Sequence, residues 1–203
     1  MSQIDVPSPI DLRLMSDALE WERTAMQRPF REDFFNAFIA QLINLGRPNL
    51  RILELGSGPG FLAERVLSQL PAASMVLLDF SSAMHELARK RLSGVINRVD
   101  FIERSFKESD WAAGFEKFDA VVTNQAVHEL RHKSYAEAFH SQVAALMKGR
   151  GVYLICDHYA GEGGMKNDQL YMSLTEQRSS LQRAGFEVVD ILIKGGRALY
   201  LVT

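Results

Sequence analysis

The chain has 203 residues, a length that fits one α/β domain better than two. Hydrophobic residues make up 47% of it and charged residues 24%, which is typical of a soluble globular protein and excludes a disordered or fibrous one. The formal net charge of −2 provides no global positive field, so no nucleic-acid partner is expected. The first residues lack the pattern of a signal peptide, and no apolar stretch is long enough to cross a membrane, so we expect a cytoplasmic protein without a membrane partner.

Helical periodicity comes before the first expected strand. It covers residues 10–26 and 30–45, and Pro29 separates the two stretches. We expect residues 1–48 to form a helical lid or cap segment that belongs to the same domain as residues 49–203.

From Ile52 onward, short apolar runs alternate with longer helical patterns, which is typical of βαβ units and a parallel sheet. The expected strands are residues 51–55, 75–79, 99–103, 118–123 and 152–157. The expected helices are residues 61–70, 82–92 and 133–148, the last ended by Gly149 and Gly151, and a further helix that begins near Thr175 and ends at Gly185. Residues 186–193 and 198–202, joined by Gly195 and Gly196, predict a hairpin that makes the final strand antiparallel.

The strongest functional signal is the run Ile52-Leu53-Glu54-Leu55-Gly56-Ser57-Gly58-Pro59-Gly60-Phe61, a strand that leads into a glycine-rich turn and a helix. Ligands of open α/β sheets bind beyond the carboxyl ends of the strands, and glycine lets a ligand approach the backbone closely. Asp79 ends the next expected strand, where an acid can accept hydrogen bonds from both ribose hydroxyls of an adenosine. The two elements together predict adenosine recognition.

Two adenosine cofactors fit such a turn, a nicotinamide dinucleotide and S-adenosylmethionine. A dinucleotide site usually has a third glycine three residues after the second, and Phe61 stands there. Glu54 would repel a pyrophosphate but suits a ligand that carries an ammonium and a sulfonium group. The local sequence therefore favours the methyl donor.

Leu53 to Gly60 resembles the first motif of the class I S-adenosylmethionine-dependent methyltransferases, small-molecule type, and Leu78-Asp79 resembles the second motif. Residues 118–122, 146–154 and 181–186 are similar to later segments of the same family. The resemblance implies an α/β three-layer sandwich with a doubly wound, mostly parallel seven-stranded sheet and an antiparallel final strand. It identifies residues 49–203 as the methyltransferase domain.

The resemblance also implies a set of donor-binding residues. Gly56, Ser57, Gly58 and Gly60 would line the amino-acid part of S-adenosylmethionine, with Glu54 positioning the loop or the ammonium group. Asp79 would hold the ribose and Phe80 would stack on the adenine. Ser105 and Phe106 would contact the adenine in place of the acid that the family often has there, and Asn124, Gln125 and Ala126 would lie under the methionine portion.

Methyl transfer from a sulfonium is an in-line displacement, so a base helps only where the acceptor must lose a proton. His128 and His158, each just past an expected strand, are the candidate catalytic residues, because imidazole titrates in the useful pH range; a structural role for each stays open. His85, His132 and His140 fall in helical or flanking patterns and are expected to face solvent. No cluster of His and Cys predicts a metal site.

Trp21, Arg23 and Arg28 alternate aromatic and basic character and are candidate lid residues over the substrate, although an amphipathic helix that covers the sheet explains them equally well. Residues 159–174, which begin with Tyr159, form a second candidate wall, and this stretch is short, which favours a small-molecule acceptor. Two alternative functions stay open: an NAD(P)-dependent oxidoreductase, and a methyltransferase-like module that binds the donor without turnover. The acceptor, the atom methylated and the oligomeric state do not follow from the sequence.

Overall fold

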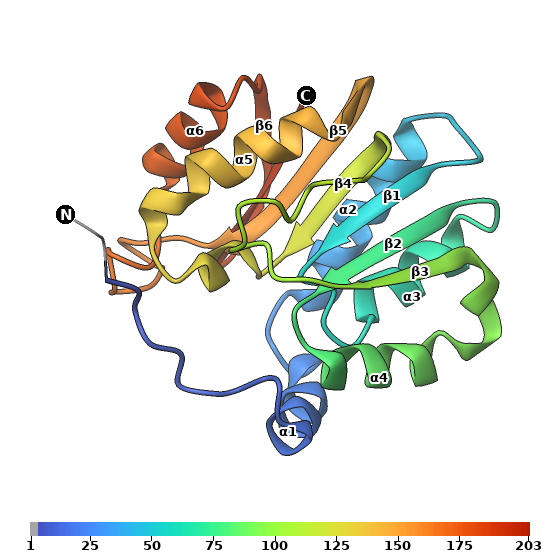
Figure 1. The fold of residues 1–203 in the computed structure, drawn as a ribbon. Coiled ribbons are helices and arrows are strands. Elements are labelled where there is room, and N and C mark those ends of the chain that lie inside the picture. Colours follow the sequence, from blue (N-terminus) through green and yellow to red (C-terminus); the bar gives the residue numbers. More distant parts are fainter. Residues whose placement is uncertain (1–3) are drawn as a thin grey trace. The chain divides into compact units, whose positions relative to one another are not determined.

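The computed structural model describes residues 4–203. Its strands form a seven-stranded sheet with the order β3-β2-β1-β4-β5-β7-β6. β2 pairs in parallel with β1 and β3, and β4 pairs in parallel with β5, whereas β7 is antiparallel to both β5 and β6. The expected fold class, a mostly parallel seven-stranded sheet flanked by helices with an antiparallel final strand, is therefore confirmed (Figure 1).

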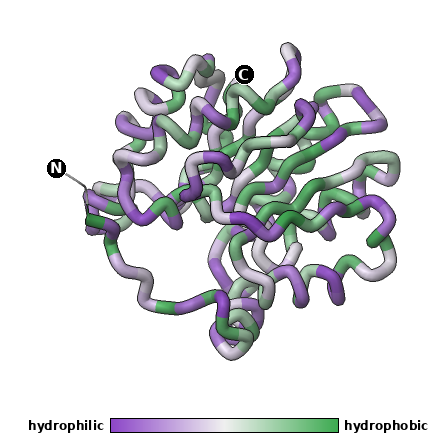
Figure 2. The backbone as a smooth tube through the Cα atoms, in the orientation of Figure 1, coloured by the Kyte–Doolittle hydropathy of each residue, from purple (hydrophilic) through white to green (hydrophobic). Residues whose placement is uncertain are grey.

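The chain divides into two compact parts, of which one is residues 9–111. Its strands are β1 (Arg51–Leu55), β2 (Ser74–Asp79) and β3 (Val99–Glu103), and its helices are α1 (Met15–Ala25), α2 (Arg31–Asn44), α3 (Phe61–Gln69), α4 (Ser82–Arg91) and the 3₁₀ segment η1 (Ser93–Arg98). The strand side chains Ile52, Leu53 and Leu77 are fully buried, as expected of parallel strands with both faces covered. Hydrophobic residues follow the strands, whereas the helices mix hydrophobic and polar residues (Figure 2).

The other part consists of Ala112–Thr203 together with residues 4–8. It contains β4 (Phe118–Asn124), β5 (Met147–His158), β6 (Val188–Lys194), β7 (Arg197–Val202), α5 (Ala136–Ala145), α6 (Leu174–Arg183) and the 3₁₀ segments η2 (Val127–Leu130) and η3 (Lys133–Tyr135). Ser173 begins α6 with a capping box, because its side chain accepts from the backbone N–H of Glu176 while the Glu176 carboxylate accepts from the Ser173 N–H. The helix that was expected to begin near Thr175 therefore begins at Leu174, and its N-cap is Ser173.

The prediction that Gly149 and Gly151 end a helix was wrong, because both lie in β5. The helix itself ends at Ala145, and the pairing of β4 with β5 is irregular between Phe118 and Ala120. A Cβ on Gly151 would lie 3.1 Å from the carbonyl oxygen of Asp119 and 3.0 Å from that of Lys148. Because glycine has no Cβ at position 151, the two backbones can approach closely in this irregular pairing.

Two of the three histidines that were expected to face solvent are buried. His140 has no exposed surface and its Nδ1 lies 3.3 Å from the Tyr153 hydroxyl, while His85 is 4% exposed and packs edge-on against Phe101. Burial lowers the pKa of His140 to about 3 and that of His85 to about 4, so both imidazoles are neutral at neutral pH. Within residues 4–203, no helix combines the length and apolar character needed to span a membrane.

Candidate functional site

The glycine-rich turn joins β1 to α3 and has a shape that side chains would strain. Gly56, Gly58 and Gly60 have φ angles of 68°, 53° and 80°, in the left-handed region that glycine adopts readily. The backbone N–H groups of Gly56 and Ser57 donate to the carbonyl oxygen of Leu78 at 2.8 and 3.2 Å. The turn is thereby fixed to the carboxyl end of β2.

Asp79, the last residue of β2, lies beside this turn. Its Oδ2 accepts from the N–H of Gly58 at 2.8 Å and its Oδ1 accepts from the N–H of Ser81 at 3.0 Å. Ser81 in turn caps α4, since its hydroxyl accepts from the Met84 N–H. The structure therefore brings the glycine turn and the predicted ribose-binding acid into direct contact.

Glu54 lies in β1, just before the turn, and its side chain is only 2% exposed. Burial, and to a lesser extent the Asp79 charge, raise the pKa of Glu54 well above its ordinary value. Among the described residues, neither Glu54 Oε2 nor the buried hydroxyl of Ser57 has a hydrogen-bond partner. Two orphaned polar groups at the turn fit a ligand that brings its own polar or cationic groups.

The residues assigned to the adenine end lie in the same part of the chain. Phe80 is partly exposed, and the Arg13 guanidinium lies 4.9 Å from the centre of its ring. Phe106 is buried, and the Ser105 hydroxyl accepts from the Lys107 N–H at 3.3 Å. One acceptor position of the Ser105 hydroxyl is therefore occupied by a hydrogen bond within its own loop.

Helix α1 packs on α4, and Ala18 lies among Ala83, Met84 and Leu87. Trp21 extends from α1 to the glycine turn, where a Cβ on Gly58 would lie 4.0 Å from its ring. Arg28 stacks on the same indole at 4.9 Å. Arg23 instead lies on the exposed side of α1 and pairs with Glu20. Of the candidate lid residues in α1, the structure brings Trp21 to the turn and leaves Arg23 away from it.

His128 belongs to η2, which follows β4, and Asp157 stands near the end of β5. The parallel register pairs Asn124 with Cys156, so the segments after both strands meet. His128 Nδ1 lies 2.7 Å from Asp157 Oδ1, and the His128 backbone N–H donates to Oδ2 at 2.8 Å. Both side chains are largely buried, with exposed fractions of 15% for His128 and 6% for Asp157. An ionised Asp157 accepts a hydrogen bond from Nδ1–H. In the neutral ring, Nε2 is then the nitrogen that carries the lone pair.

The pKa values of this pair move in opposite directions. Burial acts to lower the pKa of His128, but the charge and hydrogen bond of Asp157, helped by Glu129, outweigh it, so the pKa is raised. Burial acts to raise the pKa of Asp157, and the charge and hydrogen bond of His128 reverse this, so that pKa is lowered. Each group therefore favours the charged form of the other.

His158 has a different environment. Burial lowers its pKa to about 4, and the attraction of Asp157 does not offset this. Its Nε2 lies 3.0 Å from the side-chain nitrogen of Gln125, which adopts a left-handed backbone at φ 58°. The Gln125 N–H donates to the carbonyl oxygen of Cys156 at 2.7 Å. A strained non-glycine residue is thus held between the ends of β4 and β5.

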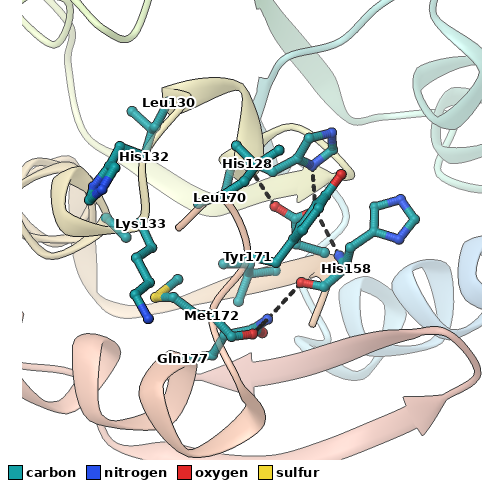
Figure 3. Close-up of a pocket in the computed structure, with 13 residues that line it drawn as sticks. His128, Leu130, His132, Lys133, His158, Leu170, Tyr171, Met172 and Gln177 are labelled. Atoms are coloured by element: carbon teal, nitrogen blue, oxygen red, sulfur yellow. Dashed lines mark hydrogen bonds and ion pairs between the residues drawn. The ribbon is translucent and has the colours of Figure 1, made fainter. Parts of the chain in front are cut away.

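A pocket lies beside these histidines, with an empty volume of about 320 Å³ that includes its opening to solvent (Figure 3). The Tyr171 ring lies 5.6 Å from that of His128 and 5.7 Å from that of His158. Gln177 of α6 donates to the His158 carbonyl at 2.8 Å and fixes the floor of the pocket. The lining combines apolar and polar side chains and consists of Val127, His128, Leu130, His132, Lys133, Ala136, Ile155, Asp157, His158, Leu170, Tyr171, Met172 and Gln177.

The structure places Leu170, Tyr171 and Met172 of the candidate wall, residues 159–174, in the lining of this pocket. Asp157 was not assigned to the site, and its place at the end of an expected strand was the available signal. Tyr159 is buried, and its hydroxyl donates to the Gly163 carbonyl at 3.1 Å, so it holds the loop instead of lining the pocket. Asn124 ends β4 and Ala126 is buried just beyond it.

Comparisons with known proteins give one family. A family model described as a methyltransferase domain matches residues 52–151. The malonyl-[acyl-carrier protein] O-methyltransferase of Legionella pneumophila is 37% identical over 78 residues, which are 38% of this chain and 26% of that protein. The release factor glutamine methyltransferase of Flavobacterium psychrophilum is 28% identical over 184 residues, which are 85% of this chain and 61% of that protein. The chain spans less than two thirds of the length of either relative.

The fold agrees with these matches. A solved S-adenosylmethionine-dependent methyltransferase from Clostridium acetobutylicum superposes with a TM-score of 0.71 at 12% identity, covering 92% of this chain and 96% of that one. The matched residues 52–151 include the glycine turn and its bond to Asp79. Residues 52–151 match the methyltransferase-domain family, and the fold of the chain is that of the class I S-adenosylmethionine-dependent methyltransferases.

Proposed function

We propose that this chain binds S-adenosylmethionine and catalyses transfer of its methyl group to a small-molecule acceptor. The observation that carries the proposal is the glycine turn bonded to Asp79, inside the segment that matches the methyltransferase domain. S-adenosylmethionine supplies an activated methyl group, so the protein must mainly bind, align and exclude water.

The donor site that we propose in residues 9–111 follows from the contacts of that part. Gly56, Gly58 and Gly60 let the amino-acid portion approach the backbone, and the orphaned Glu54 Oε2 and Ser57 hydroxyl offer it polar partners. Asp79 keeps acceptor capacity for ribose hydroxyls beside its two backbone donors. Phe80, Ser105 and Phe106 for the adenine, and Asn124, Gln125 and Ala126 for the methionine portion, stay predictions.

We assign the proton-accepting role to His128. Asp157 fixes the tautomer that leaves Nε2 with a lone pair, and Nε2 belongs to a ring that lines the pocket. His158 is a poorer base, because its lowered pKa leaves it little driving force to take a proton. The apolar side chains that line the pocket beside the two histidines support a small organic acceptor.

The expected cap, residues 1–48, is supported only at α1. There Trp21 places an aromatic ring against the glycine turn, and α1 itself is packed on α4. We therefore propose that α1 is a packed helix that also forms a wall of the donor site.

A calorimetric titration with S-adenosylmethionine, S-adenosylhomocysteine and NADH tests the proposal. We expect saturable binding of the first two and no binding of NADH. Asp79→Ala should weaken binding of S-adenosylmethionine at least tenfold, the cost of losing about one charged hydrogen bond. Asp100→Asn, a change at an exposed carboxylate of β3, is the matched control and should bind normally. Binding of NADH alone would exclude the proposed function.

A further inference from the structure

Arg131, the residue directly after η2, makes an unusual set of contacts. Its Nε donates to the carbonyl of Val6 at 2.8 Å and its Nη2 donates to that of Pro7 at 2.7 Å. Its own carbonyl accepts from the Val6 N–H at 2.8 Å. Three hydrogen bonds thus tie the main chain of residues 6 and 7 to one largely buried arginine.

The backbone of Arg131 has a φ of 66°, in the region that non-glycine residues rarely adopt. Glycine or asparagine would accept this conformation at lower cost. The local turn therefore does not explain an arginine here, whereas the contacts of its side chain do.

The remaining guanidinium nitrogen of Arg131, Nη1, is connected through Glu129 to His128, the residue that we assign as base. Arg131 Nη1 lies 3.3 Å from Glu129 Oε2, and the other carboxylate oxygen, Oε1, lies 3.4 Å from His128 Nε2. The Glu129 carboxylate is therefore shared between a permanent cation and the nitrogen that would take the acceptor's proton. Exposed fractions of 10%, 28% and 15% for Arg131, Glu129 and His128 leave these charges only partly screened by water.

We propose that Arg131 is a positioning residue for His128: its guanidinium, anchored by residues 6 and 7, holds the Glu129 carboxylate back from Nε2 and so keeps that nitrogen able to accept a proton. The inference rests on the proposed role of His128 as base. Without Arg131, Glu129 would form a full ion pair with the protonated ring and keep it charged.

Charged and titratable side chains from three segments of the chain face His128. Asp157 and His158 come from β5, Glu129 and Arg131 from η2 and its end, and Tyr171 from the loop before α6. Burial acts to lower the pKa of His128, Asp157 and Glu129 outweigh burial and raise that pKa, and Arg131 acts against this rise. Loss of Arg131 removes its repulsion and also frees Glu129, and both changes favour the protonated ring.

The test is an NMR titration of the histidine side chains in the full chain, with no donor or acceptor present. Arg131→Asn is the main variant because asparagine tolerates the left-handed backbone. We expect it to raise the titration midpoint of His128 by about half a pH unit or more, the size of one charge interaction at this range. Glu129→Gln should lower the midpoint, and Arg131→Asn should raise it less in the Glu129→Gln background than in the wild-type background.

Arg183→Gln is the matched control, since it removes an exposed arginine paired with Glu137 and should leave the His128 midpoint unchanged. His140, which is fully buried, should show no titration between pH 5 and pH 9 wherever the fold is intact, a range set by its pKa of about 3. If His140 titrates in Arg131→Asn, the fold of that variant is not intact, and the measurement is made on Arg131→Gln. The longer glutamine amide can still donate to the carbonyl of Val6 or Pro7.

An unchanged or lowered midpoint in the Arg131 variant, or an equal rise in both Glu129 backgrounds, would overturn the inference. The titration needs no turnover, so its result is independent of whether the chain methylates anything. Failure of S-adenosylmethionine binding, measured separately, would instead count against the proposed function.

Discussion

His128 and Asp157 are joined twice, once through the imidazole Nδ1 at 2.7 Å and once through the His128 backbone N–H at 2.8 Å. The two bonds use both oxygens of the carboxylate, so they fix the position of the ring as well as its tautomer.

His128→Gln should lower kcat about 10²- to 10⁴-fold for an acceptor that must lose a proton, the usual contribution of a general base. The pH profile of kcat/KM should show an acid limb that belongs to His128, because the protonated ring cannot accept a proton. His158→Gln should keep this limb, since a group whose pKa is about 4 is already neutral there. The profiles are measured with any acceptor found to turn over. An acid limb that disappears in His158→Gln but persists in His128→Gln would reverse the assignment.

Asp157→Asn should destabilise the fold in a pH-dependent way. The lowered pKa of Asp157 contributes stability that is present above its ordinary value of 3.8 and is lost as the pH falls through the folded value. The raised pKa of His128 contributes stability that is present below 6.5 and is lost as the pH rises through the folded value. Both contributions are present together between about pH 4 and pH 6.5.

Urea unfolding at several pH values measures this effect. The difference in free energy of unfolding between wild type and Asp157→Asn should be about 2–3 kcal/mol near pH 5.5, where an ion pair of low exposure is broken. Near pH 9 it should fall to about 1.5 kcal/mol, because the ring is then neutral and only its hydrogen bond to the ionised carboxylate remains. A difference that stays constant across this range would show that Asp157 does not stabilise a protonated His128.

The sequence predicted the fold well because its signals are local. The strands β1 and β3 and the glycine turn are contiguous runs, and their residue types indicate both the element and its boundary. The His128–Asp157 pair joins residues 29 positions apart, and it depends on the register that sets Asn124 against Cys156. No periodicity within either segment specifies that register.

The errors have the same origin. Helical periodicity places His140 on a helix but does not say that Tyr153 of β5 lies against it, so its burial was missed. Gly151 looked like a helix terminator because the approach of the Asp119 carbonyl is a tertiary contact. Where a residue's role is decided by a neighbouring element, the sequence alone gives the type of element and not the role.

Two glycines of the turn should respond differently to alanine. In Gly58→Ala the new Cβ meets only the Trp21 ring at 4.0 Å, so the cost is the left-handed backbone, about 1–2 kcal/mol. In Gly60→Ala the Cβ would also lie 3.2 Å from the Ala88 Cβ and 3.3 Å from Leu92 Cδ1, which adds overpacking of about 1–3 kcal/mol.

Thermal unfolding should therefore rank Gly60→Ala as the less stable variant. Binding of S-adenosylmethionine should rank them in the opposite order, because the Gly58 Cβ would enter the space beside Trp21 whereas the Gly60 Cβ would point toward α4. If the variant with the greater loss of stability also has the greater loss of affinity, the affinity reports only the stability of the turn.

Donor binding should release a proton from Glu54. Burial and the Asp79 charge raise the pKa of this side chain well above its ordinary value, which favours the neutral acid before the donor arrives. An ammonium or sulfonium group placed beside the orphaned Oε2 would lower that pKa again and expel the proton. Affinity for S-adenosylmethionine should consequently rise with pH while the free protein still holds this proton.

Calorimetry in buffers of different ionisation enthalpy counts the protons released. The wild type should release a fraction of a proton for each S-adenosylmethionine bound, and Glu54→Gln should release none. Methylthioadenosine, which has neither the ammonium nor the sulfonium group, is the matched ligand and should bind the wild type without proton release. Proton release that persists in Glu54→Gln would have to come from another group, and Glu54 would then have no direct contact with the charge of the donor.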